Sequence, residues 1–173
     1  MAIVTGFCIA GVGRGKSVAA EPPPPFVPPY SAQEALERLT ASACGRALGR
    51  ARLEALELDG WEDADGPRVA LHVEVVFPPS SNGVELHTRV VVGLVATTGE
   101  VEDPARCIAS LRGVMDQASR ALAAAEASPD VKRFLADHAS AAMVRALFSD
   151  IGPRGQITFV ANTPSGPEFF VWQ

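Results

Sequence analysis

A glycine-rich stretch near the N-terminus has the residue types of a phosphate-binding loop. The run from Ala10 to Ser17 fits a relaxed P-loop pattern and follows a strand-like segment. In such a loop, backbone amides cradle a phosphate and the N-terminus of a following helix faces the anion. That helix cannot form here, because Glu21 and four prolines follow almost at once. We therefore expect a chance match and keep nucleotide binding only as a third hypothesis, with the loop consisting of Gly11, Gly13, Gly15, Lys16 and Ser17.

Two adjacent alternating segments bring histidine and carboxylate side chains to one face of a predicted sheet. In a hairpin whose paired residue numbers sum to 161, Glu74 faces His87 and His72 faces Arg89. Two histidines and a carboxylate form the ligand set of a facial metal triad, and a histidine beside a glutamate can act as a general base. Cross-strand pairs of this kind are more often charge pairs on a solvated face. We therefore expect neither a metal site nor a catalytic residue here.

The three cysteines, Cys8, Cys44 and Cys107, are widely spaced and form no CxxC pair. No closed disulfide framework can be inferred from them, and a reducing cytoplasm is the expected compartment. Cys107 lies at the start of a predicted helix, where the helix dipole would favour the thiolate. Neighbouring acidic side chains oppose this effect, so we expect a small core residue and not a nucleophile.

Two further motifs lack the residues that their chemistry requires. The acidic turn from Glu62 to Gly66 is similar to part of a calcium loop, but Trp61 and His72 occupy the end positions where ligands are needed. No serine lies in a Gly-x-Ser-x-Gly setting, which leaves a serine hydrolase without support. The sequence predicts no catalytic residues, no cofactor and no metal.

Length and charge limit the class of protein. The 173 residues are 47% hydrophobic, which suits one packed domain. The net charge of −5 argues against a nucleic acid partner. The apolar stretch from Ala2 to Val12 is too short to span a bilayer, although a signal peptide stays an alternative. The preference for arginine over lysine, with the high alanine content, suggests a bacterial genome rich in G and C.

A proline-rich spacer divides the chain into an arm, residues 1 to 30, and a body, residues 31 to 173. Residues 21 to 29 hold six prolines and favour extended polyproline II. An extended apolar segment on such a spacer is suited to add as a strand to a neighbouring sheet edge. It could also fold back as an edge strand of its own chain or be disordered. The apolar residues of the arm are Ile3, Val4, Phe7, Ile9, Phe26 and Val27.

The sequence of the body predicts an α+β fold. It would have a mainly antiparallel sheet of about five strands and three helices, in the order α-β-β-β-α-α-β-β. A capping box at Ser31 and an Asp-Pro pair at Asp103 mark two helix starts. No internal repeat is visible. Helices are expected over 31–49, 103–127 and 128–147, and strands over 51–58, 68–77, 84–94, 156–161 and 168–172.

These features predict a non-enzymatic assembly or adaptor protein whose arm docks on a neighbouring subunit or on a partner protein. The alternative is a small-ligand-binding protein or enzyme with an apolar pocket between sheet and helices, where Glu74, His72 or His87 would act on the ligand. The two hypotheses differ in where these side chains lie: inside a cavity for the alternative, and on an open sheet face otherwise.

Overall fold

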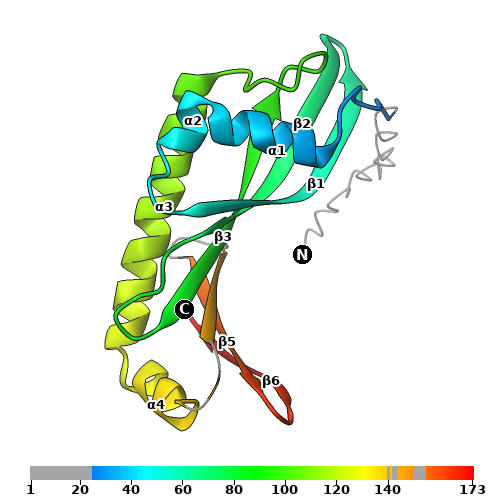
Figure 1. Cartoon of the computed structure of the whole chain (residues 1–173). Helices are drawn as coiled ribbons and strands as arrows, with labels where there is room; N and C mark the ends of the chain where they lie inside the picture. Colours follow the sequence, from blue (N-terminus) through cyan, green and yellow to red (C-terminus); the bar gives the residue numbers. More distant parts are fainter. Residues whose placement is uncertain (1–24, 140, 142–143, 150–154) are drawn as a thin grey trace, which may run out of the picture.

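A six-stranded sheet with helices on one of its faces forms the body of the chain (Figure 1). The structure, a computed structural model, describes residues 25–139, 141, 144–149 and 155–173. The α+β class is confirmed. The elements are α1 (Ala32–Ala41), α2 (Ala43–Arg46), β1 (Arg52–Asp63), β2 (Gly66–Val76), β3 (Val84–Leu94), α3 (Pro104–Ala127), α4 (Pro129–Asp137), β4 (Val144–Ser149), β5 (Gln156–Thr163) and β6 (Gly166–Trp172).

The capping signals position the two main helices as expected. Ser31 Oγ accepts the Glu34 amide at 3.2 Å, and Glu34 Oε2 accepts the Ser31 amide at 2.7 Å, which completes a capping box at the start of α1. At the start of α3, Asp103 Oδ1 accepts the Arg106 amide at 2.9 Å, with Pro104 in the first turn. Each cap satisfies amides that would otherwise lack a partner.

Strand order in the sheet follows chain order from β1 to β6. The first three strands form one antiparallel meander and the last three form another. Because β3 and β4 are parallel neighbours, the chain must cross from one end of the sheet to the other between them, and α3 and α4 make that crossing. Among the helices in the described ranges, none is long and apolar enough to cross a membrane.

One expected helix is wrong in its second half. The helix that we expect to run to Leu147 ends at Asp137, and Val144–Ser149 forms β4 instead. Val144, Ala146 and Phe148 alternate into the core, and β4 pairs with β3 on one side and β5 on the other. The alanines of this segment are compatible with the period of a helix and with that of a strand. The pairing with β3 and β5 therefore decides that the segment forms a strand.

The core consists of two clusters that α3 bridges. Near its N-terminal end, α3 contributes Leu111 to a cluster with Leu39 of α1 and the valines of β2 and β3. Near its C-terminal end, Leu122 packs in a second cluster with Phe159 of β5. Both clusters lie on the same sheet face, so the opposite face of the described sheet carries no helix. The first cluster lies over β2 and β3, and the second lies over β4 and β5 together with the start of β3.

Candidate functional site

The four residues of the expected polar face lie on the helix-free side of the sheet, but their expected cross-strand pairing is wrong. Glu74 lies opposite Arg89, and His72 lies opposite Val91, so the paired numbers sum to 163 and not to 161. A shift of two residues keeps every side chain on its face while changing its neighbours. The sequence therefore predicts which face of the sheet these side chains occupy, but not which residues lie opposite one another.

The connection between β2 and β3 explains the shift. The Phe77 amide donates to the Leu86 carbonyl oxygen at 2.9 Å, so Phe77 lies opposite Leu86 and not opposite Val84, and the connection is two residues longer than expected. The Ser80 amide then donates to the Val84 carbonyl oxygen at 2.8 Å. Gly83, with φ of 75°, supplies the left-handed residue that this tight reversal requires.

His87 lies between two carboxylates on the helix-free face. Its Nδ1 is 3.2 Å from Glu74 Oε2, and its Nε2 is 3.1 Å from Glu85 Oε1, although the latter approach lacks hydrogen-bond geometry. Glu85 also lies 3.2 Å from Arg52 Nη2. His87 is only 5% exposed, so this charge pairing is more shielded than the solvated face that we expect from the sequence.

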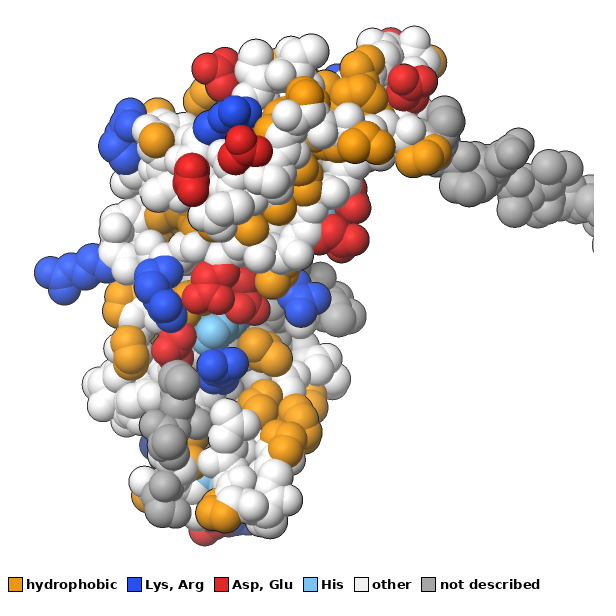
Figure 2. Space-filling model, turned by 45° about the vertical axis from the view of Figure 1, so that its right-hand side comes forward, with side chains coloured by type: hydrophobic (Ala, Val, Ile, Leu, Met, Phe, Trp, Pro, Cys, Tyr) orange, Lys and Arg blue, Asp and Glu red, His pale blue; other side chains and the backbone are white. Residues whose placement is uncertain are grey.

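The structure does not bring the two histidines of this polar face together at one site. His72 lies apart from His87 and pairs with Asp59, at 3.0 Å between Nε2 and Oδ2. Within the part of the chain that the structure describes, no three His, Cys, Asp or Glu side chains are arranged to hold a metal ion. In Figure 2, acidic, basic and histidine side chains gather at mid-height of the visible face, which fits mutual charge pairing.

Apolar side chains are exposed on the same helix-free face, over β4 to β6. Leu147 and Val171 flank Thr158 in one row across these strands, and Phe169 lies in the next row opposite Val160. Phe169 is 64% exposed and Val171 is 49% exposed. This half of the face is therefore available for contacts with another protein surface.

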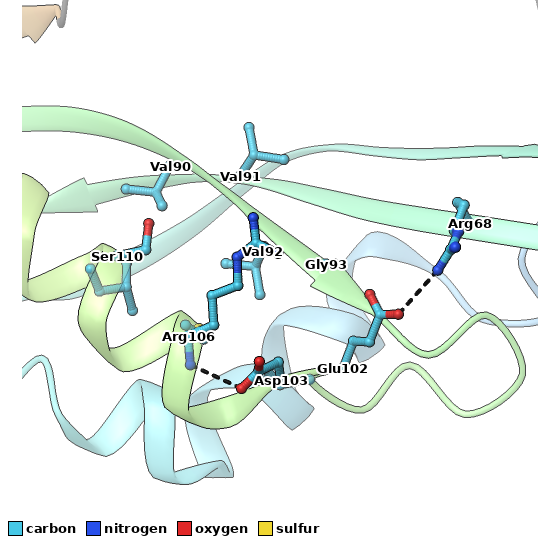
Figure 3. Close-up of a pocket in the computed structure, with 12 residues that line it drawn as sticks. Arg68, Val90, Val91, Val92, Gly93, Glu102, Asp103, Arg106 and Ser110 are labelled. Atoms are coloured by element: carbon cyan, nitrogen blue, oxygen red, sulfur yellow. Dashed lines mark hydrogen bonds and ion pairs between the residues drawn. The ribbon is translucent and has the colours of Figure 1, made fainter.

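A cleft lies between β3 and the first turns of α3 (Figure 3). Arg106 extends from α3 toward β3, and Glu102 points toward Arg68 at the other end of the cleft. Arg68 Nη1 is 3.2 Å from Glu102 Oε1, and Arg68 Nε is 3.0 Å from Asp63 Oδ2. These contacts raise the pKa of Arg68, chiefly through the hydrogen bond to Asp63. The acidic turn between β1 and β2 thus binds an arginine of its own chain.

One wall of this cleft is a strand edge without a neighbour among the described residues. The ladder between β3 and β4 ends at Thr88, whereas β3 continues to Leu94. Further along, the Glu102 amide donates to the Gly93 carbonyl oxygen at 3.1 Å. Between these two contacts, the stretch from Arg89 to Val92 has no strand on this side among the described residues, and residues 150–154, which follow β4 in the chain, lie outside them.

The end of the arm is fixed to the outer edge of β1. The Phe26 amide donates to the Gly60 carbonyl oxygen at 3.0 Å, and Phe26 packs against the first core cluster. Tyr30 is buried, and its hydroxyl donates to the Val95 carbonyl oxygen at 3.1 Å. Val27 is 84% exposed. Ile3, Val4, Phe7, Ile9 and the loop residues Gly11, Gly13, Gly15, Lys16 and Ser17 lie outside the described residues.

Two of the cysteines form a disulfide that sequence reasoning missed. Cys44 of α2 and Cys107 of α3 are bonded, across a sequence separation of 63 residues. Cys107 is a core residue, as expected, but it is bonded to Cys44, because α2 and α3 pack side by side. The only signal in the sequence is that both cysteines fall in helical segments, and spacing alone cannot bring those segments together.

Comparison with known proteins gives no match, since no protein family, no curated protein and no solved structure is similar to this chain. The cleft beside β3 is therefore judged on its own geometry. Its wall is mixed polar and apolar, with Arg68, Glu102 and Arg106 beside Val92 and Leu111.

Proposed function

We propose that the protein is a non-enzymatic assembly or adaptor protein whose apolar N-terminal arm docks on a neighbouring copy of the chain or on a partner protein. The observation that carries this proposal is β6, which lies at one end of the described sheet and exposes the side chains of Phe169 and Val171. An edge strand of this kind can bind an extended apolar segment through main-chain hydrogen bonds.

The positions of the polar side chains weigh against the alternative of a pocket enzyme. Glu74, His72 and His87 lie on the sheet face away from the helices, and each is paired with a charged neighbour on that face. Glu74 and His87 also border a hollow beside β3 that Ser110 and Val114 of α3 line, whereas His72 does not. We do not propose an enzyme that acts through these residues.

Light-scattering molar mass after size exclusion tests the proposal for self-assembly. The full chain is compared with a chain that begins at Pro25, which keeps the packed side chains of Phe26 and Tyr30. We expect an oligomer for the full chain and a monomer for the shortened one. Folded monomers in both cases would exclude self-assembly through the arm.

A further inference from the structure

We propose that β6 binds residues 3–9 of a neighbouring copy's arm as a strand antiparallel to β6, which extends the meander of β4, β5 and β6 by one strand. This inference rests on the proposed function, because it requires an arm that docks in trans. It adds the strand that receives the arm, the direction of the docked segment and the side chains that it would contact.

The two end strands of the described sheet differ in how strongly they discourage pairing with another chain. β1 has a register irregularity between Ala55 and Glu57, and at its outer edge the Phe26 amide already bonds to the Gly60 carbonyl oxygen. Its charged side chains, which also discourage pairing, are Arg52, Glu54, Glu57, Asp59, Glu62 and Asp63. In contrast, β6 pairs with β5 in a continuous register, and Glu168 is its only charged residue. Of the two end strands, β6 is therefore the one suited to receive a further strand.

Pro167 shows which main-chain groups of β6 point away from β5. A proline has no amide hydrogen to donate, so Pro167 and its partner Asn162 form a pair of the kind that lacks main-chain hydrogen bonds. Because the two kinds of pair alternate along an antiparallel ladder, Phe169 and Val171 also direct their amides and carbonyls away from β5. These are the groups that a new strand would meet.

The composition of the arm suits this edge better than a second copy of β6 does. Two β6 strands paired with each other would contain Pro167 twice, and each proline would remove a main-chain donor from the ladder. Residues 2–13 of the arm carry no proline, so only the proline of β6 itself would be present. They also carry no charged side chain, so no charge would lose its hydration on docking.

The side chains of the arm have a larger and a smaller face. In a strand, Ile3, Phe7 and Ile9 share one face, and Cys8 lies on the other. On the helix side of the sheet, Phe170 of β6 packs against the second core cluster. The larger face of the arm buries most apolar area where it continues this layer. Cys8 would then lie on the helix-free face, beside the exposed side chains of β6.

Charge favours the antiparallel direction. Arg14 and Lys16 follow the apolar segment, so an antiparallel strand carries them toward the N-terminal end of β6. Glu168 lies at that end, and its side chain is 56% exposed although it also contacts His138. A parallel strand would carry the two cations away from this carboxylate. The antiparallel direction also continues the pairing of β4 with β5 and of β5 with β6.

The place where the arm joins the described chain favours docking on a neighbouring copy. Pro25 pairs antiparallel with Trp61, so the chain before Pro25 leads toward the turn between β1 and β2. This turn lies at the opposite edge of the sheet from β6 (Figure 1). Residues 21–24 include three prolines, which favour an extended continuation in the same direction. A chain's own arm would have to reverse and cross all six strands, whereas the arm of a neighbouring copy reaches β6 without that reversal.

Disulfide trapping between two distinguishable copies tests the contact. A full chain that carries Cys8→Ser together with Phe169→Cys or Val171→Cys is co-expressed with an unaltered full chain that bears a different affinity tag. Paired Cα atoms in neighbouring antiparallel strands lie about 5.5 Å apart, a separation that a disulfide can bridge. After mild oxidation, we expect a covalent heterodimer for at least one of the two variants. Its yield should be several-fold above that of Cys8→Ser with Leu56→Cys, a control on β1 whose native side chain is 45% exposed.

The outcomes separate the two proposals. Heterodimer yields no higher than in the Leu56→Cys control would overturn the β6 site, even if the light-scattering comparison shows an arm-dependent oligomer. A homodimer of the variant chain in excess of the heterodimer would show that two copies of β6 pair with each other, which would overturn the arm as occupant. In a chain that keeps Cys8 and carries Val171→Cys, a monomer that has lost its free thiols would overturn docking in trans. An arm-independent molar mass would refute the proposed function itself.

A backbone variant tests the edge without depending on one register. Val171→Pro removes the outward amide and leaves the bonds between β5 and β6 in place, whereas Val171→Thr keeps the amide and the branched side chain. We expect assembly to be lost with proline and retained with threonine. Thermal unfolding of both variants checks that they are folded, and assembly by a folded Val171→Pro chain would contradict the proposal.

Discussion

At the scale of single residues, Gly60 is where the arm contacts the sheet. A Cβ at Gly60 would overlap the Phe26 carbonyl oxygen and crowd Pro28. We predict that Gly60→Ala displaces the 25–28 segment and lowers the free energy of unfolding by about 1–3 kcal/mol, the usual cost of overpacking. Chemical denaturation measures this, and an unchanged midpoint would show that the segment is not held there.

The same substitution at Gly113 should have the opposite effect on stability. It lies within α3, and a Cβ built on it meets nothing within 4 Å. Alanine has the higher helix propensity, so Gly113→Ala should raise the free energy of unfolding by about 1 kcal/mol. The same denaturation series measures both variants. A loss of stability for Gly113→Ala would mean that α3 is packed more closely at this turn than the structure shows.

His138 makes stability depend on pH. Its Nδ1 lies 2.7 Å from the Phe134 carbonyl oxygen, and its Nε2 lies 3.1 Å from Glu168 Oε2. The bond to Phe134, and then that to Glu168, raise the pKa of His138. A raised pKa gives stability that is complete below the unfolded-state value of about 6.5 and is lost as pH rises through the folded-state value.

We therefore predict that His138→Gln lowers the unfolding midpoint more at about pH 5.5 than at about pH 8.5. Urea titrations of the variant and the unaltered chain at both values measure the difference. If His138→Gln lowers the unfolding midpoint equally at both pH values, the imidazolium is not the group that joins α4 to β6.

The polar face shows what residue patterns alone could predict. Alternation correctly assigns His72, Glu74, His87 and Arg89 to one side of the sheet, because side-chain direction has a period of two. It could not identify the partners, since a glycine in the turn decides the register. Glu85 was missed, although it shares this face and approaches His87.

At the scale of elements, the disulfide fixes α2 to α3. Bonding Cys44 to Cys107 closes a long loop, and the chain-entropy model assigns about 4 kcal/mol to a loop of this length. We predict that Cys44→Ala together with Cys107→Ala lowers the free energy of unfolding by roughly that amount. Denaturation with and without reductant supplies the control, because only the unaltered chain should respond to the reductant.

Elements were predictable where their signals are local. Both main helices begin at their capping residues, because the side chains of Ser31 and Asp103 each accept the backbone amide three residues further along the chain. The strand β4 was not predictable, because its short alanine-containing run gains its structure from pairing with β3 and β5.

At the scale of the whole molecule, two units, each with two helices followed by three strands among the described elements, share a continuous sheet. The parallel ladder between β3 and β4 and the long helix α3 are the connections between them. The sequence shows no internal repeat from which the two units could be predicted. They share the order of their elements but not similar residues.

This arrangement predicts that the two units unfold together. Because α3 contributes Leu111 to one cluster and Leu122 to the other, loss of either cluster removes support from the helix that both require. The chain has two tryptophans, with Trp61 in β1 and Trp172 in β6, so each unit carries its own fluorescent reporter. Trp61→Phe and Trp172→Phe leave one reporter each. We expect the two fluorescence midpoints to coincide after correction for each variant's own stability, which circular dichroism measures. Separate midpoints would show that α3 does not couple the two units.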